Sequence, residues 1–272
     1  LRESGFSAQI GYDDVINPLW ERAVLLANID LPYETTFYEE EWNRIAIAQE
    51  ALTLEKYVRA IRNGRGTRLD RKKRMQVWKV FENYQNLMKE NQIRDINTAM
   101  YESTKLLQSV SRKPRYASII IDEGQDFSDN AYRLIRALAG EEHPNDIFIV
   151  GDSHQRIYRN HPTLSKCGIN VRGRSSILKI NYRTTEEIRK YAFALLNGIS
   201  FDDLDENSDL GDKCQSLTHG EKPIVENFEN ANDEFDFLLR EVKKLKENGI
   251  SLTDICVVAR TKKLVDDYIA LF

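Results

Sequence analysis

The sequence has few of the features that mark secreted or membrane-spanning proteins. Its 272 residues include only three cysteines, Cys167, Cys214 and Cys256, and their scatter predicts reduced thiols rather than a disulfide framework or a zinc knuckle. No stretch approaches the roughly 18 uncharged apolar residues of a membrane span, and the amino terminus lacks a basic-then-apolar signal pattern. We therefore expect a cytoplasmic chain with no membrane partner. Its start without methionine suggests a processed product or a piece of something longer.

Several catalytic motifs are also missing. The sequence contains no G-x-S-x-G elbow and no H-E-x-x-H pair, and its four histidines lack metal-ligand spacing with a cysteine pair. None of the 13 glycines is followed by lysine, so the G-x-x-x-x-G-K-[ST] loop that cradles nucleotide phosphates is absent from this chain. These absences argue against serine-hydrolase and zinc-peptidase chemistry.

The composition predicts a soluble, globular chain of two or three domains, because 41% of the residues are hydrophobic and 30% are charged. The net charge of −4 hides an asymmetry. Residues 1–117 carry 19 basic and 16 acidic residues, whereas residues 118–272 carry 20 and 27. The amino-terminal part is therefore the more favourable partner for a polyanion.

Most of this basic excess falls in one short region. Between residues 56 and 79 there are ten basic residues and one acid, Asp70. The candidate nucleic-acid contacts in this cluster are Arg65, Arg68, Arg71, Lys72 and Lys73. The alternative is a solvated helix face balanced by acidic neighbours from elsewhere in the fold.

The spacing of apolar residues changes at residue 118. Residues 12–110 show the three- and four-residue spacing of helices, interrupted by an N-G-R-G turn at 63–66 that places the basic cluster on a loop between two helices. From residue 118 onward, short β-branched runs alternate with helical segments. That alternation predicts an α/β layer with a mostly parallel sheet buried on both faces. The expected strands are 119–121, 147–150, 177–180 and 255–258, and the expected helices lie near 129–139, 184–197, 231–248 and 262–271.

Polar residues follow three of these expected strands directly. The first strand ends in Asp122 and Glu123, the second in Gly151-Asp152, and the third in Asn181-Tyr182-Arg183. Ligands of open α/β sheets bind beyond the carboxyl ends of the strands. One carboxylate there can hold Mg²⁺ through its water shell while its neighbour orients an attacking water. For a bare Asp-Glu pair, an ordinary polar loop is the alternative.

Taken together, these stretches resemble a known set of motifs. D-E-G-Q at 122–125, G-D-S-H-Q-R-I-Y at 151–158 and N-Y-R-T-T at 181–185 resemble, in order and spacing, motifs II, III and IV of UvrD/Rep-type superfamily-one DNA helicases. Residues 255–260 look like a later strand of the second RecA-like domain of such enzymes. Motifs I, V and VI have no counterpart in the chain.

The resemblance implies a role in ATP hydrolysis for five residues. Asp122 is implied as the Mg²⁺ ligand and Glu123 as the catalytic base. Gln155 is implied as a sensor of the γ-phosphate, Tyr182 as the residue that stacks on adenine, and Arg183 as a second contact to the γ-phosphate. The implied cofactors are therefore ATP and Mg²⁺.

The resemblance also implies DNA as the partner. Tyr158 is implied to approach single-stranded DNA. The stretch from Trp42 to Phe81 looks like the helical insertion that such helicases carry in their first RecA-like domain.

We therefore expect an α/β fold made of parts of two RecA-like domains with incomplete parallel sheets and a mostly helical amino-terminal insertion. The expected domains are 1–116, 117–172 and 173–272. The expected function is that of the middle portion of an ATP-dependent DNA helicase that moves 3′ to 5′ and is inactive on its own. A non-catalytic nucleic-acid-binding module without a phosphate loop is the alternative. Metal-dependent DNA hydrolysis is disfavoured because further acidic ligands are lacking.

Overall fold

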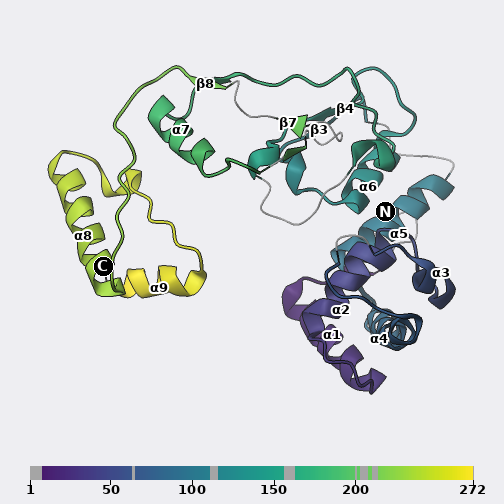
Figure 1. The fold of residues 1–272 in the computed structure, drawn as a ribbon. Coiled ribbons are helices and arrows are strands. Elements are labelled where there is room, and N and C mark those ends of the chain that lie inside the picture. Colours follow the sequence, from purple (N-terminus) through teal and green to yellow (C-terminus); the bar gives the residue numbers. More distant parts are fainter. Residues whose placement is uncertain are drawn as a thin grey trace. The chain divides into compact units, whose positions relative to one another are not determined.

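The computed structural model describes residues 8–62, 65–110, 116–155, 163–199, 201–202, 208–209 and 214–271. The chain divides into two compact units (Figure 1). The first comprises residues 1–178 and 198–213, and the second comprises residues 179–197 and 214–272. The predicted domain boundary at 116/117 lies inside the first unit. The three predicted domains, 1–116, 117–172 and 173–272, remain predictions.

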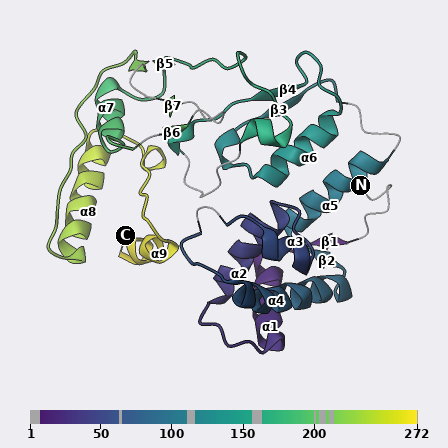
Figure 2. The same cartoon turned by 45° about the vertical axis from the view of Figure 1, so that its right-hand side comes forward.

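The amino-terminal part of the first unit is helical, as the apolar spacing predicted. Its helices are α1 (Asp13–Ala27), α2 (Thr35–Glu41), the π-helical segment Trp42–Ile47, α3 (Leu54–Arg59), α4 (Arg71–Glu90) and α5 (Ile96–Ser109). The sequence reading missed a short parallel pair, β1 (Gln9–Ile10) and β2 (Ile93–Arg94). In Figures 1 and 2 these helices gather into one cluster.

Aromatic side chains fill the core of this helical cluster. The Trp20 ring stacks on Tyr84 with centroids 3.6 Å apart, and the Trp42 and Phe81 rings meet edge to face at 5.2 Å. Capping side chains fix where the helices begin. The backbone N–H of Lys73 donates to Asp70 at the start of α4, and that of Thr98 donates to Asp95 at the start of α5.

The α/β part of the first unit is built on two parallel strands. Its elements are β3 (Ile119–Ile121), a 3₁₀ turn (Gly124–Asp126), α6 (Asp129–Ala139), β4 (Ile147–Ile149), two further 3₁₀ turns (Ser153–Gln155 and Leu164–Cys167), and the antiparallel pair β6 (Phe201–Asp202) and β7 (Ser208–Asp209). Ile119 pairs with Ile147 and Ile121 with Ile149. The strands at 119–121 and 147–149 and the helix at 129–139 confirm the prediction.

The prediction that this sheet is buried on both faces is wrong for the described residues. Ile121 packs against Tyr132 of α6 and Leu164, whereas Ile120 is 75% exposed and Phe148 is 61% exposed. Alternate residues of a strand point to opposite faces, and only one face is covered here.

The second unit pairs a small parallel sheet with three helices. Its elements are β5 (Ile180–Asn181), α7 (Glu186–Ala194), β8 (Gln215–Ser216), α8 (Ala231–Glu247), a 3₁₀ turn (Leu252–Asp254) and α9 (Lys262–Leu271). The three helices confirm the prediction. The predicted strand at 177–180 is present only from Ile180, and the predicted strand at 255–258 is wrong, because those residues have no paired strand in the described chain and Val258 is 85% exposed.

Among the helices of the described residues, none is long and apolar enough to cross a membrane.

Candidate nucleotide and nucleic-acid sites

The two carboxylates of the D-E-G-Q stretch lie where β3 ends. Asp122 and Glu123 are both exposed, and the backbone N–H of Glu123 donates to Asp122 Oδ1 at 2.9 Å. Glu123 adopts a left-handed conformation with φ of 52°, which is uncommon for a residue with a side chain. The chain therefore turns sharply at this point, and both carboxylates stay accessible.

Two glycines allow the D-E-G-Q and G-D-S-H-Q stretches to approach each other closely. A Cβ on Gly124 would lie 2.6 Å from Ile149 Cγ2, and a Cβ on Gly151 would lie 2.8 Å from Gln125 Oε1. The hydroxyl of Tyr132, a residue of α6, donates a hydrogen bond to the Gly124 carbonyl at a distance of 2.5 Å. Larger residues would push the two stretches apart.

Gln125 connects the two stretches. Its side chain is buried, with 1% exposed, and its Nε2 donates to Glu123 Oε2 at 2.6 Å. Its Oε1 accepts from the Asp152 backbone N–H at 2.9 Å. The Asp152 carboxylate in turn accepts from Gln155 Nε2 at 2.8 Å. The chain of hydrogen bonds brings the predicted base Glu123 and the predicted sensor Gln155 into one network.

The sequence reading did not assign Gln125, Asp152 or the two glycines to the site. Their signal was present, because all four stand inside the quoted stretches at the ends of paired strands. The sequence could not predict the register of β3 against β4, which brings the Gln125 side chain to the Asp152 backbone N–H. Tyr158 lies outside the described residues.

The exposed carboxylates suit a Mg²⁺ ion held mostly by water and phosphate. Mg²⁺ in phosphoryl-transfer sites uses one or two carboxylates and keeps several waters. Asp122 offers such a carboxylate at the end of a strand, with Glu123 next to it. No cluster of three or more metal-ligating side chains occurs within the described ranges, so a fully protein-enclosed metal centre is not found there.

The N-Y-R-T-T stretch forms a tight turn between β5 and α7 in the second unit. Asn181 Oδ1 accepts from the backbone N–H of Arg183 at 2.8 Å, and Asn181 Nδ2 donates to Thr184 Oγ1 at 2.6 Å. Thr185 caps α7. Tyr182 is 74% exposed and Arg183 is exposed, so the turn presents both side chains outward.

A buried carboxylate fixes this turn to the sheet. Glu186 accepts two hydrogen bonds from Arg189 at 2.6 and 2.9 Å and one from the Ser216 backbone N–H of β8 at 2.8 Å. The bonds from Arg189 and then from Ser216 hold the pKa of Glu186 at about 2. The sequence reading did not single out Glu186.

The predicted placement of the basic cluster on a loop is only partly right, because the cluster also includes residues of α3 and of the first turns of α4. Its side chains are divided between inward and outward positions. Glu41 is fully buried, and its carboxylate accepts from Arg62 at 2.5 and 2.9 Å and from Arg65 at 3.1 Å. Arg65 also pairs with Glu40. Arg74 Nη1 donates to the carbonyls of Tyr57, Val58 and Ala60. Three basic residues therefore hold the loop in place.

The other predicted DNA contacts face outward. Arg68, Arg71 and Lys72 are exposed and Lys73 is half-buried, around the first turn of α4. Arg65 differs from them, because only 7% of its side chain is exposed. The structure therefore gives Arg65 an internal, loop-holding set of contacts, while its contact with DNA remains a prediction.

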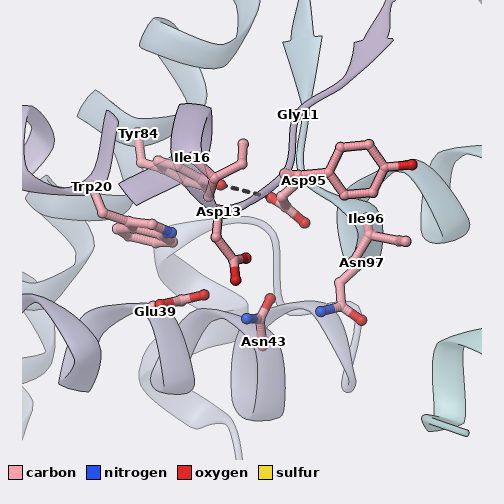
Figure 3. Close-up of a pocket in the computed structure, with 11 residues that line it drawn as sticks. Gly11, Asp13, Ile16, Trp20, Glu39, Asn43, Tyr84, Asp95, Ile96 and Asn97 are labelled. Carbon is pink, nitrogen blue, oxygen red and sulfur yellow. Dashed lines mark hydrogen bonds between the residues drawn. The ribbon is translucent and has the colours of Figure 1, made fainter. Parts of the chain in front are cut away.

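A small hollow of about 70 Å³ in the helical cluster is acidic (Figure 3). Asp13, Glu39 and Asn43 point into the same space, and Tyr84 donates to Asp95 at its edge. Burial, and then the neighbouring Asp13 and Asp95, raise the pKa of Glu39. This concentration of negative charge would repel phosphates, so we do not place nucleic acid here.

Comparisons with known proteins assign the family. The family model for the UvrD/REP helicase N-terminal domain matches residues 27–161, and that for the UvrD-like helicase C-terminal domain matches residues 176–268. The chain therefore belongs to the UvrD/Rep-type superfamily-one helicases, as its motifs predicted.

Three relatives illustrate the likeness. The chain is 28% identical over 177 residues to a probable DNA helicase II homolog of Mycoplasma pneumoniae, across 62% of this chain and 24% of the relative. It is 24% identical over 205 residues to the ATP-dependent DNA helicase UvrD1 of Mycobacterium tuberculosis, across 68% of this chain and 25% of the relative. It is 26% identical over 196 residues to the ATP-dependent DNA helicase PcrA of Staphylococcus aureus, across 67% of this chain and 25% of the relative. The matched region thus spans about a quarter of each relative.

Proposed function

We propose that this chain forms the middle portion of an ATP-dependent DNA helicase that translocates 3′ to 5′. The observation that carries the proposal is the hydrogen-bonded network from Glu123 through Gln125 and Asp152 to Gln155, which joins two of the motifs. The names of the relatives support ATP and DNA as the substrate and partner. Because the chain contains no phosphate-binding loop, we infer that it does not hydrolyse ATP by itself.

In this proposal the residues divide the work of phosphoryl transfer. Mg²⁺ on Asp122 would supply charge neutralisation at the phosphates when bound. Glu123 would accept a proton from the attacking water, and Gln125 would fix the direction of its carboxylate. Gln155 would contact the γ-phosphate. In the second unit, Arg183 would also contact the γ-phosphate and Tyr182 would stack on the adenine.

The experiment is an ATPase assay on a longer protein that joins this chain to a G-K-[ST] loop, with and without single-stranded DNA. We expect hydrolysis that DNA stimulates, and a loss of about 10²-fold or more in Glu123→Gln with ATP binding retained. Glu141→Gln, at an exposed position of the same unit, is the control and should behave as the wild type. Unchanged turnover in Glu123→Gln would remove that residue from catalysis.

A non-catalytic nucleic-acid-binding module is the competing function, and it requires that the longer protein also lack the phosphate loop that this chain does not contain. The same assay separates the two. A longer protein that binds DNA but shows no DNA-stimulated hydrolysis would support the binding module and contradict the helicase.

A further inference from the structure

A second hollow lies in the first unit, and its lining includes no residue of the D-E-G-Q stretch or of the basic cluster at 56–79. It has a volume of about 390 Å³, within the roughly 300–1,000 Å³ typical of ligand sites. Helices α5 and α6 and the turn at Leu164–Cys167 line it. Three basic side chains reach it: Arg133 and Arg136 from α6, and the exposed Lys166 from the turn.

Two of the neighbouring carboxylates already have basic partners. Glu50 pairs with Lys105 at 2.8 Å, and Asp146 pairs with Arg136 at 2.7 Å. A third, Asp129, lies 3.5 Å from the Cys167 thiol. Burial and then Asp129 raise the pKa of that thiol to about 12, so Cys167 adds no negative charge at neutral pH.

Arg133 is the residue whose charge is not balanced in this way. Its Nη1 donates to the Ala48 carbonyl at 2.8 Å and lies 3.4 Å from Asn130 Oδ1, both of which are neutral acceptors. Among the described residues, the Arg133 side chain makes these two hydrogen bonds and no ion pair. The fold therefore holds the Arg133 guanidinium in place through neutral acceptors.

The lining also indicates which part of a ligand would enter. Gln108 adds an exposed side-chain amide, whereas the Thr104 hydroxyl and the backbone N–H groups of Gly140 and Gly168 already donate within the chain. No aromatic ring is present among the lining residues. A site that reads bases would use aromatic stacking, whereas positively charged and neutral polar groups suit phosphate oxygens.

We propose that the hollow between α5 and α6 binds a phosphate group of the backbone of single-stranded nucleic acid, held by Arg133 and Lys166. The inference rests on the nucleic-acid binding in the proposed function and adds a contact that the basic loop does not provide. Binding there is independent of base sequence, because only the backbone is contacted.

The test is a fluorescence-anisotropy titration of a labelled oligothymidylate with the 272-residue chain at several NaCl concentrations. Each phosphate contact contributes about 0.7 to the slope of log affinity against log salt, which is about fivefold in affinity at 0.1 M salt. We expect Arg133→Gln to weaken binding by up to about fivefold, and the double variant Arg133→Gln/Lys166→Gln to lose the whole contact, about fivefold in affinity with a slope shallower by about 0.7, because both side chains hold the same phosphate.

Two further variants separate charge from folding. Lys89→Gln removes one exposed charge elsewhere in the unit and should leave the affinity nearly unchanged. Arg133→Lys keeps the charge and should keep the slope. If Arg133→Lys loses as much slope as Arg133→Gln, or if Arg133→Gln leaves the slope unchanged, the proposal is overturned.

The remaining outcomes identify the ligand and separate this inference from the proposed function. Calorimetry with inorganic phosphate tests for a different ligand. If the double variant loses phosphate binding but keeps the wild-type DNA slope, the hollow binds free phosphate and the backbone site is contradicted. The backbone site would likewise be contradicted if an acidic peptide displaced the bound phosphate while the variants bound DNA as the wild type does. If the wild-type chain binds no oligothymidylate at all, both the proposed nucleic-acid binding and the phosphate site in the hollow are contradicted. If the variants bind as the wild type does, only the phosphate site in the hollow is contradicted.

Discussion

The backbone N–H of Asp152 donates to the buried side-chain oxygen of Gln125 at 2.9 Å. The same glutamine donates to Glu123 through its nitrogen at 2.6 Å. The oxygen of this one amide thus accepts a hydrogen bond from the G-D-S-H-Q stretch, while its nitrogen donates one within the D-E-G-Q stretch. A carboxylate or a hydrocarbon side chain cannot make both bonds.

Replacing Gln125 should therefore disturb both motifs. We expect Gln125→Ala to lower the free energy of unfolding of the chain by about 1–3 kcal/mol, because the half-buried Asp152 N–H loses its partner. Gln125→Glu should also destabilise, since two carboxylates would face each other. Chemical denaturation measures both changes, and Gln155→Ala, at an exposed position, is the control with a smaller expected loss. Equal stability of Gln125→Ala and the wild type would show that the network is unimportant.

The buried Glu41 should be far more important for stability than an exposed glutamate. We expect Glu41→Gln to cost about 3–5 kcal/mol, because it leaves Arg62 and Arg65 without their buried counter-charge. The matched control is Glu55→Gln, whose ion pair with Arg59 is exposed at both ends and should contribute about 0.5 kcal/mol or less. Similar melting temperatures for the two variants would contradict this ranking.

The outward basic residues should govern the salt dependence of DNA binding. We expect the triple reversal Arg68→Glu, Arg71→Glu and Lys72→Glu to flatten the log–log slope by about 0.7 for each phosphate that the protein no longer binds. Arg65 is left unchanged, because its reversal would break the pairing with Glu41 and confuse folding with binding. Anisotropy titrations provide the slope. A triple variant that keeps the wild-type slope would leave these residues as a solvated surface.

The exposed turn at Tyr182 and Arg183 should bind nucleotide weakly without a phosphate loop. One aromatic ring contributes about 0.5–1.5 kcal/mol beyond area burial, which is too little to offset the entropy lost on association. We expect an ATP dissociation constant of about 1 mM or weaker for the chain, measured by calorimetry. In a longer protein with the loop, Tyr182→Ala should weaken ATP and ADP alike, whereas Arg183→Ala should spare ADP. Equal losses for both nucleotides in Arg183→Ala would show that the arginine does not contact the γ-phosphate.

Acid should weaken the link between α7 and the segment after β8. Glu187 accepts from the Gly220 backbone N–H and lies 2.9 Å from His219 Nδ1, and the bond with His219, followed by that with Gly220, lowers the pKa of Glu187 to about 2. A lowered pKa means that the charged form is favoured in the folded state, so this stability is present above about pH 4.5 and is lost as the pH falls toward 2. Unfolding curves between pH 2 and 7 should be less pH-dependent in Glu187→Gln. Glu221→Gln, at an exposed position of the same segment, should retain the wild-type dependence.

The sequence by itself determined the helices, the order of the motifs and the family. Helix positions follow from local chemistry: apolar spacing gives α4 and α8, and capping residues such as Asp70 and Thr185 stand next to the turns that they close. The motifs are local too, because each follows a strand directly. The β1–β2 pair was missed, since Gln9 pairs with Ile93 from a distant part of the chain.

Only the tertiary structure decided which charged residues serve the fold and which face solvent. Arg65 and Arg68 look alike in sequence, but Glu41 lies 24 positions from Arg65 and the folded chain brings the two together. Likewise, Gln125 meets Asp152 across 27 positions because β3 and β4 pair in a particular register. Residue type alone also does not reveal whether a neighbouring element covers Ile120 or pairs with residues 255–258, and neither occurs in the described chain. Local propensity is encoded residue by residue, whereas burial and pairing are properties of contacts between distant residues.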